Sequence, residues 1–96
     1  MTDPKRIIST ALHGYGAENQ KVKCIEELAE LQKELCKDLI GQGSRFHVAE
    51  EIADTEILLA QMKVHYGIAK DVDAIKSQKL KQLAQKLNLE SDEYEE

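Results

Sequence analysis

The chain has 96 residues, of which 42% are hydrophobic, 32% charged and 4% aromatic, with one Pro, five Gly and no Trp. This length fits one domain, and the balance of hydrophobic, charged and aromatic residues favours a helical protein over a sheet-based or disordered one. The formal net charge of −5 argues against non-specific nucleic-acid binding, which needs a cationic surface. Because no apolar run approaches the ~20 residues that span a bilayer, and no signal peptide opens the sequence, we expect no membrane partner and a cytoplasmic protein.

Two helices are predicted in the N-terminal half. Asp3-Pro4 supplies an N-cap and a Pro at the first helical position, and Gly14 and Gly16 are expected to end this first helix. Its inward side chains should be Ile7, Ile8, Ala11 and Leu12. The second helix is expected from about residue 17 to residue 39, with an apolar stripe at helical spacing. That stripe comprises Val22, Ile25, Leu28, Ala29, Gln32, Leu35, Cys36 and Leu39.

Two further helices are predicted after the Gly-Gln-Gly-Ser loop at residues 41–44. The third should run from about residue 45 to residue 66, with Gly67 closing it. The fourth should begin at a cap provided by Asp71 or Asp73 and end near Leu87. Residues 90–96 are expected to form an acidic, frayed tail, which leaves a single all-α domain over residues 1–89.

Four helices, two of them long and joined by a short loop, imply an antiparallel four-helix bundle. The third helix is apolar on two opposite sides, so it should be buried almost all round. One side carries Val48, Ile52, Leu59 and Tyr66, and the other Ala49, Ala53, Ile57, Ala60 and Val64. One chain of this length cannot easily cover both sides. We therefore expect homo-oligomerisation, as a homodimer or homotetramer, to complete the bundle.

Two acidic pairs at i, i+3 spacing carry the main functional signal. Glu27 and Glu30 share one face of the second helix, and Glu51 and Asp54 share one face of the third. Ionised carboxylates on an otherwise apolar helix are disfavoured unless something compensates them, and four that face one another repel. A hard divalent cation removes both problems. The predicted metal ligands are therefore Glu27, Glu30, Glu51 and Asp54, with Mg²⁺ as the ion and Mn²⁺ as a substitute.

These acidic residues also have other interpretations. The second helix taken alone is compatible with a solvated face of Glu27, Glu30 and Glu34 paired with Lys23 and Lys33. The position of Glu51 and Asp54 on a buried helix favours the metal site instead. His47, one turn before Glu51, is a weaker candidate ligand, because a His at a helix start more often caps the helix or faces solvent. A di-iron carboxylate site is disfavoured, since no Glu-x-x-His motif occurs.

The fourth helix places two lysines within its apolar sector. Its expected inward stripe comprises Val72, Ile75, Leu80, Leu83 and Leu87. Lys76 and Lys79 project within the same sector. They either extend to water from an apolar face or hold phosphate groups that arrive with the metal.

The acidic motifs together resemble a known family. Glu-Glu-x-x-Glu at residues 26–30, followed after twenty residues by Glu-x-x-Asp at residues 51–54, is similar to the signature of the MazG-like all-α nucleotide pyrophosphohydrolases. The resemblance covers residues 15–87, and the stretch at residues 15–20 is similar to that of compact, phage-type members. It implies the four Mg²⁺ ligands above and a phosphate-binding role for Lys76 and Lys79.

The reaction that this resemblance implies is Mg²⁺-dependent hydrolysis of a (deoxy)nucleoside triphosphate to a monophosphate and pyrophosphate, which would serve nucleotide-pool housecleaning. Glu26 or Glu30 would accept the proton of the attacking water. Candidates for contact with the base, or for support of the metal ligands, are His13, Tyr15, Asn19, Gln20 and Lys23. Pyrimidine triphosphates, non-standard purines and phosphoribosyl-ATP all stay open as substrates. The alternatives to an enzyme are a non-catalytic helical dimer that binds a partner protein and a sensor that binds Mg²⁺-nucleotide without turnover.

Overall fold

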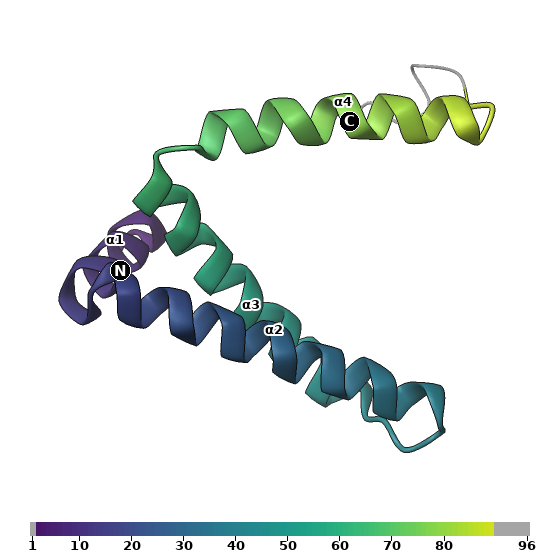
Figure 1. Ribbon diagram of the computed structural model, residues 1–96, viewed down its shortest axis with the longest axis horizontal. Helices are drawn as coiled ribbons and strands as arrows, with labels where there is room; N and C mark the ends of the chain where they lie inside the picture. Colours follow the sequence, from purple (N-terminus) through teal and green to yellow (C-terminus); the bar gives the residue numbers. More distant parts are fainter. Residues whose placement is uncertain (1, 90–96) are drawn as a thin grey trace. The chain divides into compact units, whose positions relative to one another are not determined.

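The computed structural model describes residues 2–89 (Figure 1). These residues form four α-helices and no strand, which confirms the all-α prediction. The helices are α1 (Pro4–Tyr15), α2 (Ala17–Leu39), α3 (Arg45–Tyr66) and α4 (Ala69–Lys86). Within the described range, no helix is long and apolar enough to cross a membrane. The tail predicted over residues 90–96 lies outside that range.

The chain divides into two compact units, Met1–Tyr66 and Gly67–Glu96. The first unit contains α1, α2 and α3, and α2 and α3 form its main helix–helix contact. The second unit contains α4. The candidate metal ligands all belong to the first unit, so its packing decides the geometry of the site.

The start of α1 agrees with the prediction from Asp3-Pro4, and of the two glycines predicted to end the helix only Gly16 does so. The Asp3 carboxylate accepts a hydrogen bond from the Lys5 backbone N–H at 3.2 Å. Gly14 lies inside the helix, so the prediction that it ends α1 is wrong. Gly16, at φ 93°, is the terminating residue, and its N–H donates to the Leu12 carbonyl at 3.0 Å. An isolated Gly costs a helix only about 1 kcal/mol, whereas a residue with positive φ cannot continue it.

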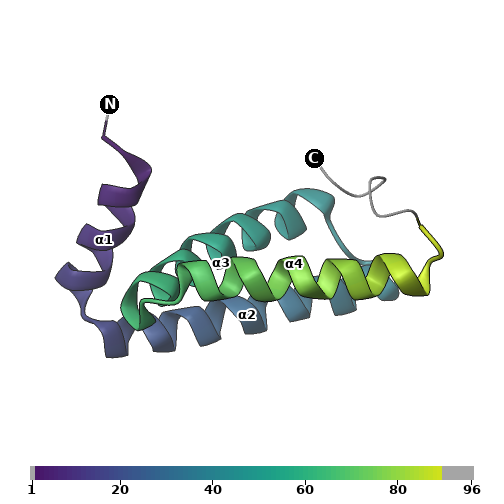
Figure 2. The same cartoon turned by 90° about the horizontal axis from the view of Figure 1, so that it is seen from above.

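The antiparallel pair of α2 and α3 has the predicted bounds (Figure 2). The Ser44 hydroxyl accepts a 3.4 Å hydrogen bond from the His47 backbone N–H and so caps α3. The cap predicted for the fourth helix is wrong, because α4 begins at Ala69, before Asp71. There the Val72 N–H donates to the Ile68 carbonyl at 2.9 Å.

The face of α2 that contacts α3 is its polar flank and not its apolar stripe. The buried or half-buried residues of that flank are Gln20, Cys24, Glu27, Leu31 and Glu34. The α3 residues of the same kind that lie opposite are Glu51, Asp54, Thr55, Leu58 and Gln61. The apolar stripe of α2 is exposed, with Ile25 67% and Leu28 45% accessible. We call the contact between α2 and α3 the polar seam.

Several apolar side chains predicted to be inward are exposed. In α1, Leu12 is buried but Ile7 is 53% exposed. Both predicted apolar sides of α3 are open, with Ile52 41% and Ile57 49% exposed. Four of the five residues in the predicted inward stripe of α4 are also exposed, namely Ile75, Leu80, Leu83 and Leu87. The buried hydrophobic residues in the described part of the first unit are Leu12, Cys24 and Leu58. The sequence therefore carries more apolar helix surface than the first unit buries internally.

The loop between α2 and α3 contains a close backbone approach that generates a prediction. A Cβ added at Gly43 would lie 2.7 Å from the Asp38 Cα, a backbone atom that cannot rotate away. Gly43→Ala should therefore lower the free energy of unfolding by about 1–3 kcal/mol, as overpacking does. Gly14→Ala is the matched control, because Gly14 is helical and its Cβ would meet nothing within 4 Å. This control should raise stability by about 0.5–1 kcal/mol. Thermal unfolding followed by circular dichroism measures both, and equal shifts of the same sign would contradict the prediction.

Candidate metal centre

Three carboxyl groups meet in the polar seam. Glu27 from α2 and Glu51 and Asp54 from α3 each place one oxygen so that the three atoms lie within 4.8 Å of one another. All three side chains are half-buried. The i, i+3 spacing puts Glu51 and Asp54 on one turn of α3, and the packing of α2 brings Glu27 opposite them. We call this group the acidic cluster.

The electrostatics of the acidic cluster are unfavourable without a cation. Burial raises the pKa of Glu51 above its usual value, a side-chain hydrogen bond with Glu27 raises it further, and so do the negative charges of Glu27, Asp54 and Glu30. The Oε2 atom of Glu51 is shielded from solvent and has no hydrogen-bond partner. A buried oxygen without a partner costs free energy that a bound cation would recover. Three carboxylates form a donor set that suits a hard divalent ion such as Mg²⁺ or Mn²⁺.

Two hydrogen bonds join α2 to α3, one at Glu27 and one nearer the start of α2. The buried Thr55 hydroxyl donates to the Glu27 carbonyl oxygen at 3.4 Å, beside the acidic cluster. The Gln20 side-chain amide donates to the Gln61 amide oxygen at 2.8 Å, and both residues are buried. Gln20, a predicted base contact, is thus engaged within the seam. Thr55 was missed in the sequence, where the only signal is a hydroxyl directly after Asp54 on the same helix.

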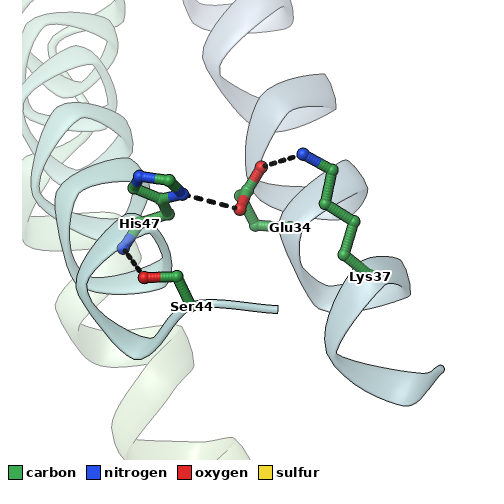
Figure 3. A network of polar contacts seen from close by, with 4 residues as sticks. All are labelled: Glu34, Lys37, Ser44 and His47. Atoms are coloured by element: carbon green, nitrogen blue, oxygen red, sulfur yellow. Dashed lines mark hydrogen bonds and ion pairs between the residues drawn. The ribbon is translucent and has the colours of Figure 1, made fainter. Parts of the chain in front are cut away.

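A separate polar contact lies nearer the loop end of the seam (Figure 3). Glu34 is only 7% exposed, and its Oε2 lies 3.3 Å from the Lys37 ammonium. Its Oε1 lies 3.6 Å from the His47 Nδ1, too far for a hydrogen bond. His47, the weaker candidate ligand, therefore neighbours Glu34 and is not a member of the acidic cluster. The signal for this contact was that Glu34 follows Glu27 by two helical turns, on the same face.

One turn before Glu27, Lys23 borders the acidic cluster. Its ammonium lies 3.5 Å from the Glu27 Oε1, and its side chain is 53% exposed. A pocket of about 210 Å³ is lined by Lys23, Glu27, Asp54, Ile57 and Leu58. A basic side chain and two cluster carboxylates thus share one small pocket.

The remaining candidates lie outside the acidic cluster. Glu26 and Glu30 are exposed on α2, and the charge of Glu30 still acts on Glu51. Asn19 donates to the Tyr15 carbonyl at 2.8 Å, which braces the α1–α2 junction, while the Tyr15 side chain is 68% exposed. His13 lines a pocket of about 230 Å³ at that junction, with Leu12, Gly16, Ala17, Val64 and His65. Lys76 and Lys79 are exposed on α4, in the second unit.

Comparison of the chain with protein-family models, with curated proteins and with solved structures gave no match. The case for a function consequently depends on the geometry of the acidic cluster and on the motifs that form it.

The raised pKa of Glu51 predicts that Glu51→Gln stabilises the metal-free protein at neutral pH and destabilises the protein relative to the wild type when Mg²⁺ is present. A raised pKa means that the folded state binds the proton more tightly than the unfolded state, so stability falls as pH rises from the ordinary glutamate value to the raised one. Without metal, Glu51→Gln should therefore raise the midpoint of thermal unfolding at neutral pH. The gain should shrink as the pH approaches about 4, where an ordinary Glu is protonated. With saturating Mg²⁺ the order should reverse, because the ion stabilises only the protein that binds it.

The control for this experiment is Glu56→Gln, an exposed glutamate on the same helix, which should change neither response. A metal-free Glu51→Gln protein that is less stable than the wild type at neutral pH would contradict the prediction.

Proposed function

We propose that this chain is a Mg²⁺-dependent nucleotide pyrophosphohydrolase similar to the MazG-like all-α enzymes. It would hydrolyse a (deoxy)nucleoside triphosphate to a monophosphate and pyrophosphate. The observation that carries the proposal is the acidic cluster, because Glu27, Glu51 and Asp54 are three of the four ligand positions selected by the two acidic motifs. A divalent cation held there supplies charge neutralisation at phosphate oxygens and acidifies coordinated water.

The residues of α2 around the cluster have distinct proposed roles. Glu27 would hold the ion together with the two α3 carboxylates, and Glu30, which is exposed on α2, would be the fourth ligand. Glu26 or Glu30 accepts the proton of the attacking water, because both side chains are exposed on α2, one and three residues from Glu27. Their exposure lets the proton leave to bulk water.

Lys76 and Lys79 are proposed to bind the departing pyrophosphate. Both ammonium groups are on exposed positions of α4, so they remain available to an anionic ligand. A cation near a leaving group stabilises the negative charge that develops on it in the transition state.

We further propose that the chain works as a homodimer or homotetramer. The support is the apolar surface that α2 and α3 leave open, including Ile25, Leu28, Ile52 and Ile57. A first unit with so few buried apolar residues gains stability when a second copy removes this surface from water.

A pyrophosphate-release screen with Mg²⁺ or Mn²⁺ tests the activity over standard, deoxy- and damaged nucleoside triphosphates. Glu27→Gln or Asp54→Asn should lower turnover by more than the ~10–100-fold loss typical of residues that only support metal ligands. The helical circular-dichroism signal should be unchanged. Glu56→Gln, exposed on α3 near Asp54, is the control that should keep full activity.

Two results would contradict the proposed activity. Retention of most activity in both ligand variants would exclude the acidic cluster as the site. Binding of Mg²⁺-nucleotide with no pyrophosphate release from any substrate would favour the sensor, and no response to Mg²⁺ at all would favour the protein-interaction module.

The assembly has its own test. Leu28→Glu should shift the mass measured by light scattering from an oligomer towards the monomer, since a buried unpaired carboxylate at an interface is strongly disfavoured. Lys33→Glu is the control, because Lys33 is an exposed residue of the same helix that already carries a charge. A wild-type protein that is monomeric at all concentrations would contradict the proposal.

A further inference from the structure

We propose that Lys23 is a phosphate-contacting residue of this site, whose ammonium binds a non-bridging oxygen of the polyphosphate. The inference rests on the proposed function and assigns a role to a side chain outside the acidic motifs. It follows from three observations: where Lys23 lies, what charge the acidic cluster leaves uncancelled, and what lines the neighbouring pocket.

Lys23 lies one helical turn before Glu27, on the same flank of α2. Its ammonium is 3.5 Å from the Glu27 Oε1, and the side chain is 53% exposed while that of Glu27 is 13% exposed. An i, i+4 ion pair on a helix surface contributes only about 0.3–0.5 kcal/mol to stability. The ammonium is therefore free to exchange its partner when a better acceptor arrives.

Charge balance supplies the reason for such an exchange. The four carboxylates proposed as ligands and one Mg²⁺ leave two negative charges when all four are ionised, which would repel a polyphosphate. The Lys23 ammonium offsets one of these charges. A cation that binds Glu27 also competes with Lys23 for the Glu27 carboxylate, so Lys23 can exchange this partner for a phosphate oxygen. Lys carries three N–H donors and suits such a contact.

The volume and lining of this pocket suit phosphate groups and not a whole nucleotide. Its volume of about 210 Å³ is smaller than the ~300–1,000 Å³ of pockets that enclose drug-sized ligands. Its lining combines the carboxylates of Glu27 and Asp54 with the apolar Ile57 and the buried Leu58, and Lys23 is its basic lining residue within the described chain. The Lys23 ammonium is therefore the group in this pocket that can pair with a phosphate oxygen.

The experiment compares Lys23→Met with Lys33→Met in two titrations. Mn²⁺ alone is titrated first, and inorganic pyrophosphate is then titrated in the presence of saturating Mn²⁺, with calorimetry as the readout. Lys23→Met should tighten Mn²⁺ binding, because a competing cation is gone, and weaken pyrophosphate binding by about tenfold or more, the loss expected for one charge-assisted hydrogen bond. Lys23→Arg keeps the charge and should restore most of the pyrophosphate affinity. Lys33→Met should change neither constant.

The opposite signs of the two effects separate phosphate contact from a structural ion pair. If Lys23→Met tightens Mn²⁺ binding and leaves pyrophosphate affinity equal to that of Lys33→Met, the inference is overturned. Pyrophosphate release by the wild type would in that case leave the proposed function standing. A wild type that binds Mn²⁺ but neither binds nor releases pyrophosphate overturns both.

Discussion

The contact between α2 and α3 encloses carboxyl groups at positions where helix pairs commonly bury apolar side chains. Glu27, Glu51 and Asp54 lie close together there, and Glu34 is nearly inaccessible two turns further along α2. Each carboxyl group must be paired, protonated or bound to a cation, because burial of an uncompensated charge is costly. Lys37 and His47 flank Glu34, while Lys23 reaches only Glu27. Within residues 2–89 no basic side chain pairs with Glu51 or Asp54, and the proposed cation site rests on this imbalance.

Directional polar contacts also fix the register of the two helices. The hydrogen bonds of Gln20 with Gln61 and of Thr55 with the Glu27 carbonyl each require one alignment of α2 on α3. Apolar contacts alone tolerate sliding more easily than hydrogen bonds do, since dispersion has no preferred direction. The seam thereby sets the positions of the proposed metal ligands, and the proposed assembly rests on the open apolar stripe of α2.

The spacing of residues predicted the bounds of α2 and α3 and the pairing of Glu51 with Asp54, because helical periodicity is a local property. It did not predict which face of a helix meets which neighbour. Ile7 has the periodicity of an inward residue and is exposed, and Glu34 looks like a solvated acid and is buried. The contact of Thr55 with Glu27 joins residues 28 positions apart, beyond any local pattern. The prediction that Gly14 ends α1 failed because a single Gly is tolerated inside a helix. Gly16 ends it instead, since its positive φ is set by the turn into α2.

The proposed ion site and the proposed assembly surface lie on different faces of α2. The seam residues such as Glu27 face α3, while Ile25 and Leu28 point to a different side. Glu30 follows Lys23 by seven residues, so both lie along the same exposed edge of the helix, beside the acidic cluster. An anionic substrate that approached along this edge would meet Lys23 and the proposed cation without touching the apolar stripe. The proposed second copy of the chain could therefore cover that stripe while the proposed site stays open.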